Sequence, residues 1–416
     1  MSRHFQPAPI PAEIAKSEQP VSFEPSADPH LLAPFDHQPR TRIVFGVNAV
    51  ERVGELCKEI GAQRILLVTD SGIVRAGHAD LVAEHIRRAD LRLAIFSGVQ
   101  ENPGEACIAE CVAAARAANV DMIVGLGGGS SMDTAKGCNF ILTNGGKMQD
   151  YWGVGKAAKP MLPLVAIPTT AGTGSECQSF ALISDEKTHQ KMACGDPKAA
   201  ARVAILDPTL TLSQPVRVTA CTGIDAIAHA VETAVTKKRS ALSLIYSHAA
   251  FKLCVTSFPK VLKSPADLEA RGKMLLGAAL AGLAIENSML GAAHSCANPL
   301  TAHFGIVHGE AVGLMLRHVI RFNAKDPAAA LAYAELASAP ELACVTDGSA
   351  QAVDALVARI EMLLDLANMP KRLQDRGVTE ESIGQLASEA ARQWTATFNP
   401  RAISVPEFKQ LFRAAL

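Results

Sequence analysis

Four residues with metal-ligating side chains lie between Asp225 and His308. Asp225 and His229 are four positions apart, and residues with this spacing stand on the same face of a helix. His294 and His308 follow in apolar, Gly- and Ala-rich sequence, where an unpaired polar group is costly. One carboxylate and three imidazoles form a ligand set that suits a divalent first-row metal such as iron(II) or zinc. We therefore predict a metal site built from all four residues.

The alternative interpretation is that these side chains are hydrogen-bonded residues of a helical core. The spacing of Asp225 and His229 is common on any helix, so this pair alone is weak evidence for a metal. The set of four is stronger evidence than its members, because one metal ion would satisfy every polar group at once.

A glycine-rich loop from Gly125 to Asp133 follows a predicted strand at 121–127 and precedes a helix predicted to begin near Met132. Consecutive glycines let the backbone approach a ligand, and their amides form an anion site together with the N-terminus of the next helix. This order of strand, glycines and helix favours the binding of a pyrophosphate. A tight strand-to-helix turn is the alternative interpretation.

The loop does not match the usual dinucleotide fingerprint, which follows the first strand and has its acidic residue about 20 positions later. Here the glycines follow the fourth predicted strand, and the candidate acid, Asp70, ends the second at 64–70. Asp70 is suited either to bind an adenosine ribose or to cap a helix. A carboxylate would repel a 2′-phosphate, so the first interpretation favours NAD(H), with NADP(H) as the less favoured cofactor.

Strands and helices alternate in the first half of the chain, which predicts a parallel sheet covered on both faces. The predicted strands are 42–46, 64–70, 91–96, 121–127, 164–168, 180–183, 191–194 and 203–206. Asn48 is predicted to cap a helix that reaches about Ile60, and further helices are predicted at about 74–88 and up to Ala118.

After Pro215 the strand signals stop and helical periodicity remains, in Ala-rich segments at 223–236, 240–256, 266–286, 309–323, 350–368 and 380–394. This shift predicts a domain boundary near 208–215. We expect an extended or disordered lead-in at 1–40, an α/β NAD(P)-binding domain at 41–213 and a helical metal-binding domain at 214–416.

Composition excludes several classes of partner. The 416 residues carry 40 basic and 41 acidic side chains, without the clustered basic charge that nucleic acid or an acidic membrane requires. No apolar run reaches the roughly 18 residues of a membrane span, and the N-terminus lacks the apolar region of a secretory signal. Ten scattered cysteines without a Cys-x-x-Cys pair predict reduced, buried thiols in a cytoplasmic protein.

Four motifs occur in a fixed order: Gly-Gly-Gly-Ser-x-x-Asp, Ile-Pro-Thr-Thr-Ala-Gly-Thr-Gly-Ser-Glu, Thr-Gly-x-Asp-Ala-x-x-His and His-x(13)-His-Gly. Over about residues 40–416 the chain resembles the iron-containing (group III) alcohol dehydrogenases. The resemblance implies a non-standard Rossmann domain, an all-α domain and a cleft between them for metal and nicotinamide, an architecture shared with dehydroquinate synthase. It also implies hydride transfer between NAD(P) and a small alcohol, aldehyde or hydroxy acid, with the metal polarising the substrate oxygen.

By position, the resemblance implies that the metal ligands are Asp225, His229, His294 and His308. It implies that Asp70 faces the adenosine ribose, that Asn102 lies near the adenine and that Lys191 reaches the nicotinamide ribose. The remaining residues implied to contact the cofactor are Gly127, Gly128, Gly129, Ser130, Asp133, Thr169, Thr170, Thr173 and Ser175.

One position departs from the family pattern. Many relatives carry a histidine before the proline near the third ligand, often assigned to proton transfer or substrate contact, whereas this chain has Asn298. Asparagine is no general acid. A solvent path, a threonine or another histidine, of which His303 is the nearest in sequence, would then relay the proton, or the substrate would differ.

Three other functions remain open. A hydroxyacid–oxoacid transhydrogenase has the same motifs. A lyase resembling 3-dehydroquinate synthase shares the architecture, but that family uses a glutamate and two histidines as metal ligands. The third is a protein that binds metal or nucleotide without catalysis. For the enzyme we expect a small-molecule substrate and a homodimer or larger homo-oligomer.

Overall fold

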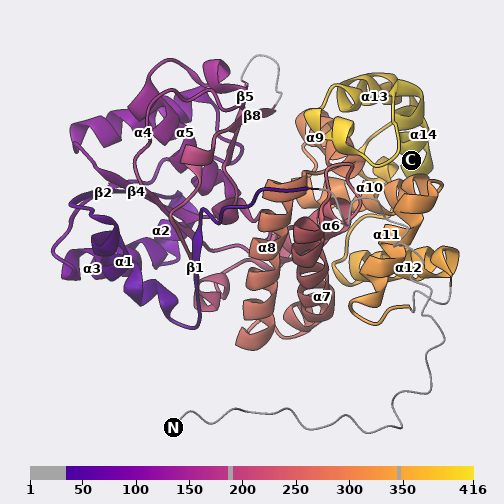
Figure 1. Ribbon diagram of the computed structural model, residues 1–416, viewed down its shortest axis with the longest axis horizontal. Coiled ribbons are helices and arrows are strands. Elements are labelled where there is room, and N and C mark those ends of the chain that lie inside the picture. The colour runs from indigo at the N-terminus through magenta and orange to yellow at the C-terminus, as the bar shows by residue number, and fades with distance from the viewer. Residues whose placement is uncertain (1–33, 186–190, 344–347) are drawn as a thin grey trace, which may run out of the picture.

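The computed structural model describes residues 34–185, 191–343 and 348–416, in two parts that lie side by side (Figure 1). The N-terminal part alternates strands and helices, and the C-terminal part is helical. This confirms the expected fold class, an α/β part with a parallel sheet followed by an all-α part. Most of the expected lead-in falls outside the described residues, and residues 34–41 form neither helix nor strand.

The main sheet has six parallel strands in the order β1-β9-β6-β4-β2-β3. They are β1 Arg42–Phe45, β2 Arg64–Val68, β3 Arg92–Phe96, β4 Met122–Gly127, β6 Leu164–Pro168 and β9 Val203–Leu206. The predicted short strands at 180–183 and 191–194 belong instead to a second, three-stranded sheet. Its members are β5 Gly153–Val154, β7 Phe180–Ser184 and β8 Lys191–Gly195, and β7 pairs with β8 in antiparallel fashion.

Helices cover both faces of the main sheet, because successive side chains of a strand point to opposite sides. The helices on the two faces are α1 Val53–Ile60, α3 His78–Arg88, α4 Glu105–Ala117 and α5 Gly129–Asn144. Leu66 and Val68 of β2 belong to the core under α4 and α5, whereas Ile65 and Leu67 belong to the core under α1 and α3. Burial on both faces is the environment in which parallel sheets occur.

The carboxyl ends of three strands meet at one edge of the main sheet. Gly127 at the end of β4 pairs with Pro168 at the end of β6, and Val68 of β2 pairs with Gly125 of β4. The loops that follow these strands therefore leave the sheet next to one another. Ligands of open parallel sheets bind at this kind of edge.

Two local predictions are wrong. Asn48 has a φ of +60° and its side chain makes no cap hydrogen bond, so α1 begins only at Val53. The single helix predicted at 74–88 is two helices, α2 Ser71–Arg75 and α3. Gly77, with a φ of +82°, separates them, because a left-handed residue ends a helix.

The helical part contains nine α-helices in the described residues. They are α6 Val216–Thr233, α7 Ala241–Lys263, α8 Leu268–Ser288, α9 Ala292–Phe304, α10 His308–Asn323, α11 Pro327–Ser338, α12 Ser349–Leu366, α13 Ile383–Ala391 and α14 Val405–Ala415. Helices α9, α11 and α14 lie outside the Ala-rich segments predicted from the sequence. Helix α9 contains Pro299, a residue that argues against a helix interior when only the sequence is read.

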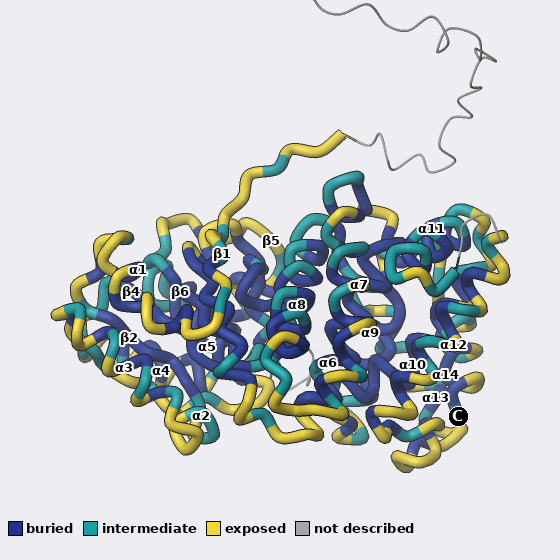
Figure 2. Tube along the Cα trace, turned by 90° about the horizontal axis from the view of Figure 1, so that it is seen from below, coloured by how far each residue is buried: buried dark blue, intermediate teal, exposed yellow. Residues whose placement is uncertain are grey.

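Helix α7 is the most apolar long helix of this part. Among the described residues it is the one single helix with the length and apolarity of a membrane span, with a mean hydropathy of 1.2 over its most apolar stretch, and α8 and α9 pass the same test only as a pair bent by 107°. Half of that stretch is buried, and Phe251, Cys254 and Phe258 are fully enclosed in the core that α7 shares with α6 and α8. Figure 2 shows buried segments inside both parts of the molecule.

Helix α8 touches the loop after β6 backbone to backbone. A Cβ atom at Gly282 would lie 2.2 Å from the carbonyl oxygen of Gly174, and one at Gly174 would lie 2.6 Å from that of Ala278. No side chain larger than hydrogen fits either position. This contact holds the loop against the helical part.

We expect Gly282→Ala to lower the free energy of unfolding by about 1–3 kcal/mol, because the added methyl group must push α8 away from the loop. Urea denaturation followed by circular dichroism measures the change. The matched control is Gly384→Ala on α13, where a Cβ meets nothing within 4 Å. Equal stability of the two variants would contradict the close contact.

Candidate active site

The loops at the carboxyl edge of the sheet line an open groove of about 640 Å³. The predicted cofactor residues in its wall are Asp70, Gly128, Gly129, Ser130, Thr169 and Thr170. Helix α5 begins at Gly129, so its free backbone N–H groups face this groove, as an anion site requires. A Cβ at Gly129 would lie 2.8 Å from the Thr173 side chain, so the glycine is needed for two loops to meet.

Asp70 caps a helix, as its alternative interpretation proposed. Its Oδ1 accepts hydrogen bonds from the backbone N–H groups of Gly72 at 2.7 Å and Ile73 at 3.0 Å, at the start of α2. The cap occupies only one carboxylate oxygen. The other, Oδ2, lies 3.4 Å from the position of a Cβ on Gly127, on the side of the glycine-rich loop. The cap therefore leaves one oxygen to face a ligand in the groove.

A cavity of about 440 Å³ lies between the α/β part and the helical part. Both parts supply predicted site residues to its wall: Asn102, Gly128, Gly129, Ser130, Asp133, Thr170, Thr173, Ser175, Lys191, Asp225, His229, His294 and His308. Gly127 lies in β4 beneath the loop, where its carbonyl accepts a hydrogen bond from Thr169. The groove and the cavity share Gly128, Gly129, Ser130 and Thr170, so they form one continuous cleft.

The four predicted metal-binding residues converge on one point of this cavity. Oδ1 of Asp225 lies 3.5 Å from Nε2 of His229, 3.4 Å from Nε2 of His294 and 3.9 Å from Nε2 of His308. Helix α6 carries Asp225 and His229 one turn apart, α9 carries His294, and His308 is the first residue of α10. The ring centroids of His229 and His294 are 4.8 Å apart.

These groups have the chemistry of a cation site. Asp225, His229 and His294 are each only 4% exposed, yet among the described residues Oδ1 of Asp225 and Nε2 of His294 have no hydrogen-bond partner. Two buried polar atoms that face each other unpaired would be costly, and a cation between them would remove that cost. A divalent metal therefore fits the donor set.

The electrostatics favour neutral imidazoles at two of the three histidines, His229 and His308, and an ionised carboxylate at Asp225. Burial lowers the pKa of His229, and burial together with the Lys191 ammonium lowers the pKa of His308 to about 3. Burial alone would raise the pKa of Asp225, but the imidazoles of His229, His294 and His308 outweigh it and hold that pKa below its usual value. Neutral imidazole and ionised carboxylate are the protonation states that bind a metal.

Glu232 is a site residue that the sequence reasoning missed. Its Oε2 lies 2.5 Å from Nδ1 of His294, and its Oε1 accepts a hydrogen bond from the backbone N–H of Ala293. A carboxylate on the far nitrogen of a metal-binding histidine fixes the ring and its tautomer. Burial would lower the pKa of His294, but Glu232 and Asp225 raise it to about 9. The signal was present in the sequence, because Glu232 follows Asp225 by seven positions, on the same helical face.

Lys136 is a second missed residue. It is fully buried, and its Nζ donates to the backbone oxygen of Ser175 at 2.6 Å, to Ser175 Oγ at 2.9 Å and to the backbone oxygen of Phe180 at 2.9 Å. Burial raises the pKa of Asp133 to about 6 and that of Glu176 to about 7, and Lys136 opposes both shifts. It lies three residues after Asp133, a spacing that places both on one face of α5.

A smaller cavity of about 70 Å³ adjoins the histidines. Its apolar wall consists of Phe180, Leu182, Ile285, Leu290 and Trp394. Asn298, one helical turn after His294, also lines it and donates a hydrogen bond to Gln393 at 3.0 Å. This cavity has the size and apolarity to hold the carbon chain of a short substrate.

His303 does not line either cavity. It stands nine residues after His294, which places it on the opposite face of α9, and its Nε2 contacts Glu389 at 2.7 Å near the surface. This placement contradicts the suggestion that His303 relays a proton to the site.

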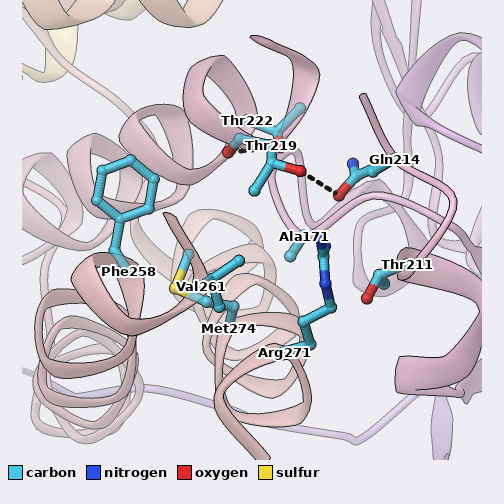
Figure 3. Close-up of a pocket in the computed structure, with 9 residues that line it drawn as sticks. All are labelled: Ala171, Thr211, Gln214, Thr219, Thr222, Phe258, Val261, Arg271 and Met274. Atoms are coloured by element: carbon cyan, nitrogen blue, oxygen red, sulfur yellow. Dashed lines mark hydrogen bonds between the residues drawn. The ribbon is translucent and has the colours of Figure 1, made fainter. Parts of the chain in front are cut away.

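A small cavity beside the loop after β6 is lined by none of the predicted site residues (Figure 3). Arg271 of α8 rises toward Ala171 there, and Phe258 and Met274 form the apolar side. Its volume is about 10 Å³, which is room for about one water molecule. It is too small to be a substrate site.

Comparison with known proteins gives the same family that the motifs resemble. Residues 39–208 match the iron-containing alcohol dehydrogenase family, and residues 219–416 match the C-terminal domain of the Fe-containing alcohol dehydrogenase family. The NAD-dependent methanol dehydrogenase of Bacillus methanolicus is 36% identical over 374 residues, 90% of this chain and 97% of that protein. The 1,3-propanediol dehydrogenase of Klebsiella pneumoniae is 32% identical over 92% of this chain and 98% of its own length.

Solved structures of similar proteins indicate the same family. A crystal structure of 1,3-propanediol oxidoreductase superposes with a TM-score of 0.88 at 32% identity, covering 92% of this chain and all of that one. The chain belongs to the iron-containing alcohol dehydrogenase family. It is an oxidoreductase that transfers a hydride between a nicotinamide dinucleotide and a small alcohol or aldehyde.

We expect Lys136→Met to lower the free energy of unfolding by about 1–3 kcal/mol, because the backbone oxygens of Ser175 and Phe180 lose their buried donor. The measurement is the midpoint of urea denaturation. The control is Lys273→Met, which removes only an exposed ion pair with Glu269 on α8 and should leave the midpoint unchanged within error. A wild-type midpoint for Lys136→Met would show that the buried ammonium is dispensable.

Proposed function

We propose that Asp225, His229, His294 and His308 together bind one divalent metal ion, iron(II) or zinc, and that the adjoining cleft binds NAD(H). The observation that carries the proposal is the unpaired Oδ1 of Asp225, which three imidazole nitrogens surround at 3.4–3.9 Å. When bound, the metal supplies Lewis-acid polarisation of the substrate oxygen, and the nicotinamide accepts or donates the hydride.

Separate groups of the chain are proposed to bind the pyrophosphate and to orient a metal ligand. The backbone amides of Gly128, Gly129 and Ser130, at the start of α5, bind the pyrophosphate. Glu232 keeps a proton on Nδ1 of His294 and so leaves Nε2 free to face the metal.

The remaining assignments divide the cleft between the two ends of the dinucleotide. Asp70 binds the adenosine ribose, and Asn102 lies toward the adenine. Gly127, Asp133, Thr169, Thr170, Thr173, Ser175 and Lys191 line or support the path toward the nicotinamide. The carboxylate of Asp70 favours NAD(H) over NADP(H), because it would repel a 2′-phosphate.

The substrate is proposed to be a short primary alcohol or its aldehyde. The apolar walls and the volume of about 70 Å³ next to His294 and His308 support this size. Two of the relatives described above are named for methanol and 1,3-propanediol. The walls exclude bulk water from the reacting carbon, which protects the hydride transfer. Asn298 would orient the substrate rather than transfer a proton, since its amide has no acidic proton to give.

Two further features of the molecule are proposed. A cytoplasmic location is supported by the cysteines, since all those that the structure describes are free and buried. A homodimer or larger assembly is supported by β1, whose outer edge carries no partner strand within the described chain. The domain boundary is proposed at 213/214, and the start of α6 at Val216 supports it.

His294→Ala tests the metal site. We expect the purified variant to lose most of its metal and its alcohol-dependent reduction of NAD, because one of four ligands and the partner of Glu232 are removed. Elemental analysis and NADH absorbance measure the two quantities. The matched control is His303→Ala, a histidine on the same helix but on its opposite face, which should retain both.

The outcomes separate the candidate functions. Full metal content in His294→Ala would refute the ligand assignment. Metal in the wild-type protein without turnover of any short alcohol or aldehyde would redirect the search to a hydroxyacid–oxoacid transhydrogenase, assayed with a hydroxy acid and an oxo acid together. The lyase is disfavoured by the ligand set of one aspartate and three histidines.

Asp70→Gly tests the cofactor preference. We expect the ratio of kcat/KM for NADP to that for NAD to rise by about tenfold, the scale of one lost like-charge contact. Glycine is tolerated as a helix cap, so α2 should persist. Asp267→Gly removes an equivalent cap from α8 at a residue that lines neither the groove nor the cavity, and should leave the ratio unchanged. An unaltered ratio in Asp70→Gly would refute the ribose assignment.

A further inference from the structure

Glu286, near the end of α8, joins three segments of the chain through one carboxylate. Oε1 accepts hydrogen bonds from Ser179 Oγ at 2.7 Å and from Arg40 Nη1 at 2.9 Å, and Oε2 accepts one from the backbone N–H of Ser179 at 3.0 Å. The Glu286 side chain is 13% exposed, and Ser179 is 4% exposed. Ser179 and Arg40 flank strands of the α/β part, whereas Glu286 belongs to the helical part. The contact is therefore a bridge between the two parts.

The neighbours of this bridge in sequence line the small cavity beside the histidines, and they come from both parts of the molecule. Gln178 and Phe180, on either side of Ser179, line the cavity from the α/β part. Ile285, directly before Glu286, lines it from the helical part. The length of the bridge thus controls the distance between these two sets of lining residues.

The α/β side of the bridge is itself held rigidly. Lys136 donates to the backbone oxygens of Ser175 and Phe180, so it fixes the segment on both sides of Ser179. Because this segment is fixed, the hydrogen bonds from Ser179 to Glu286 hold α8 close to the α/β part. A flexible loop would instead let Ser179 follow α8 while the two parts moved apart. Stacking of Phe180 on Trp394, with ring centroids 5.5 Å apart, adds an apolar contact across the same boundary.

Residues 34–41 contain Arg40 and are therefore the third segment that the bridge joins. They run past α8 on their way to β1 (Figure 1), and His37 contacts the ring of Tyr246 on α7. The Arg40 side chain is 44% exposed, so its ion pair with Glu286 is screened by solvent. The contact between Ser179 and Glu286 is buried, so it contributes most of the bridge's stability.

We propose that Glu286 is a positioning residue that clamps the two parts together and sets the width of the substrate cavity. The proposal rests on the proposed function only in taking the cavity of about 70 Å³ as the substrate site. Without the clamp, a larger share of molecules is open, and apparent affinity falls in proportion to the closed fraction. Substrate binding still drives closure, so the chemical step is affected less than the binding of substrate.

Kinetics of Glu286→Ala with alcohols of two lengths test the clamp. We expect the KM for 1-propanol to rise about tenfold, the scale of losing hydrogen bonds to a buried charge, with a change in kcat of less than about threefold. The KM for 1-hexanol should rise less or fall, because the wider cavity admits the longer chain. Glu286→Gln should be intermediate, since its amide oxygen can still accept from Ser179 Oγ while its NH₂ group cannot accept from the backbone N–H.

Two controls separate positioning from general loss of stability. Glu269→Ala removes another glutamate from α8, one that pairs only within its own helix, and it should keep wild-type constants for both alcohols. Ser179→Ala should reproduce part of the effect, and the double variant with Glu286→Ala should show less than the sum of the two. Arg40→Ala should change the KM only slightly, and the change should vanish at high salt.

A second measurement does not depend on turnover. Hydrogen exchange of the segment 175–184 should be faster in Glu286→Ala than in the wild type and in Glu269→Ala. If exchange is faster in Glu286→Ala but neither the wild type nor the variants have activity, the proposed function is refuted and the clamp is supported. Unchanged exchange, or a lower unfolding midpoint with wild-type KM for both alcohols, would overturn the clamp. If Glu286→Ala does not fold, the same tests apply to Ser179→Ala.

Discussion

The burial of Asp225 among three imidazoles is the constraint on which the rest of the structure depends. A carboxylate and three histidines removed from water carry a large desolvation cost, and no group in the described part of the chain offsets it through a hydrogen bond to Oδ1 of Asp225. A fold can retain such a group when a cation completes it. The three helices α6, α9 and α10 must then hold their residues at distances set by that cation, and their packing leaves little freedom.

Support for the site comes from outside the ligand set. Glu232 ties the His294 ring to the helix that carries Asp225, so two of the three site helices are joined by one carboxylate. On the other side of the cleft, Lys136 ties the loop containing Ser175 to α5. Each support is a buried charge with several hydrogen bonds, which is stronger and more directional than apolar contact.

The cleft exists because two different architectures meet along one line. The parallel sheet directs three loops to a single edge, where glycines allow them to touch one another and the start of α5. The helical part meets this edge through α8, whose Gly282 allows backbone contact with the loop after β6. The residues proposed to bind dinucleotide and metal are thereby brought into one cleft, although Asp70 and His308 at its two extremes are 238 positions apart in sequence.

The sequence by itself determined the strand–helix alternation, the change to an all-helical second half and the order of the family motifs, because periodicity and motif spacing are local properties. Asp225 and His229 were predictable as neighbours since a helix fixes them one turn apart. Tertiary structure decided that Asp70 does cap α2, that His303 faces away from the site, and which residues Lys136, Glu232 and Glu286 contact. Their partners are Phe180, His294 and Ser179, which lie 44, 62 and 107 positions away. No local pattern encodes contacts over such distances, because they arise only when separate helices and loops pack against one another.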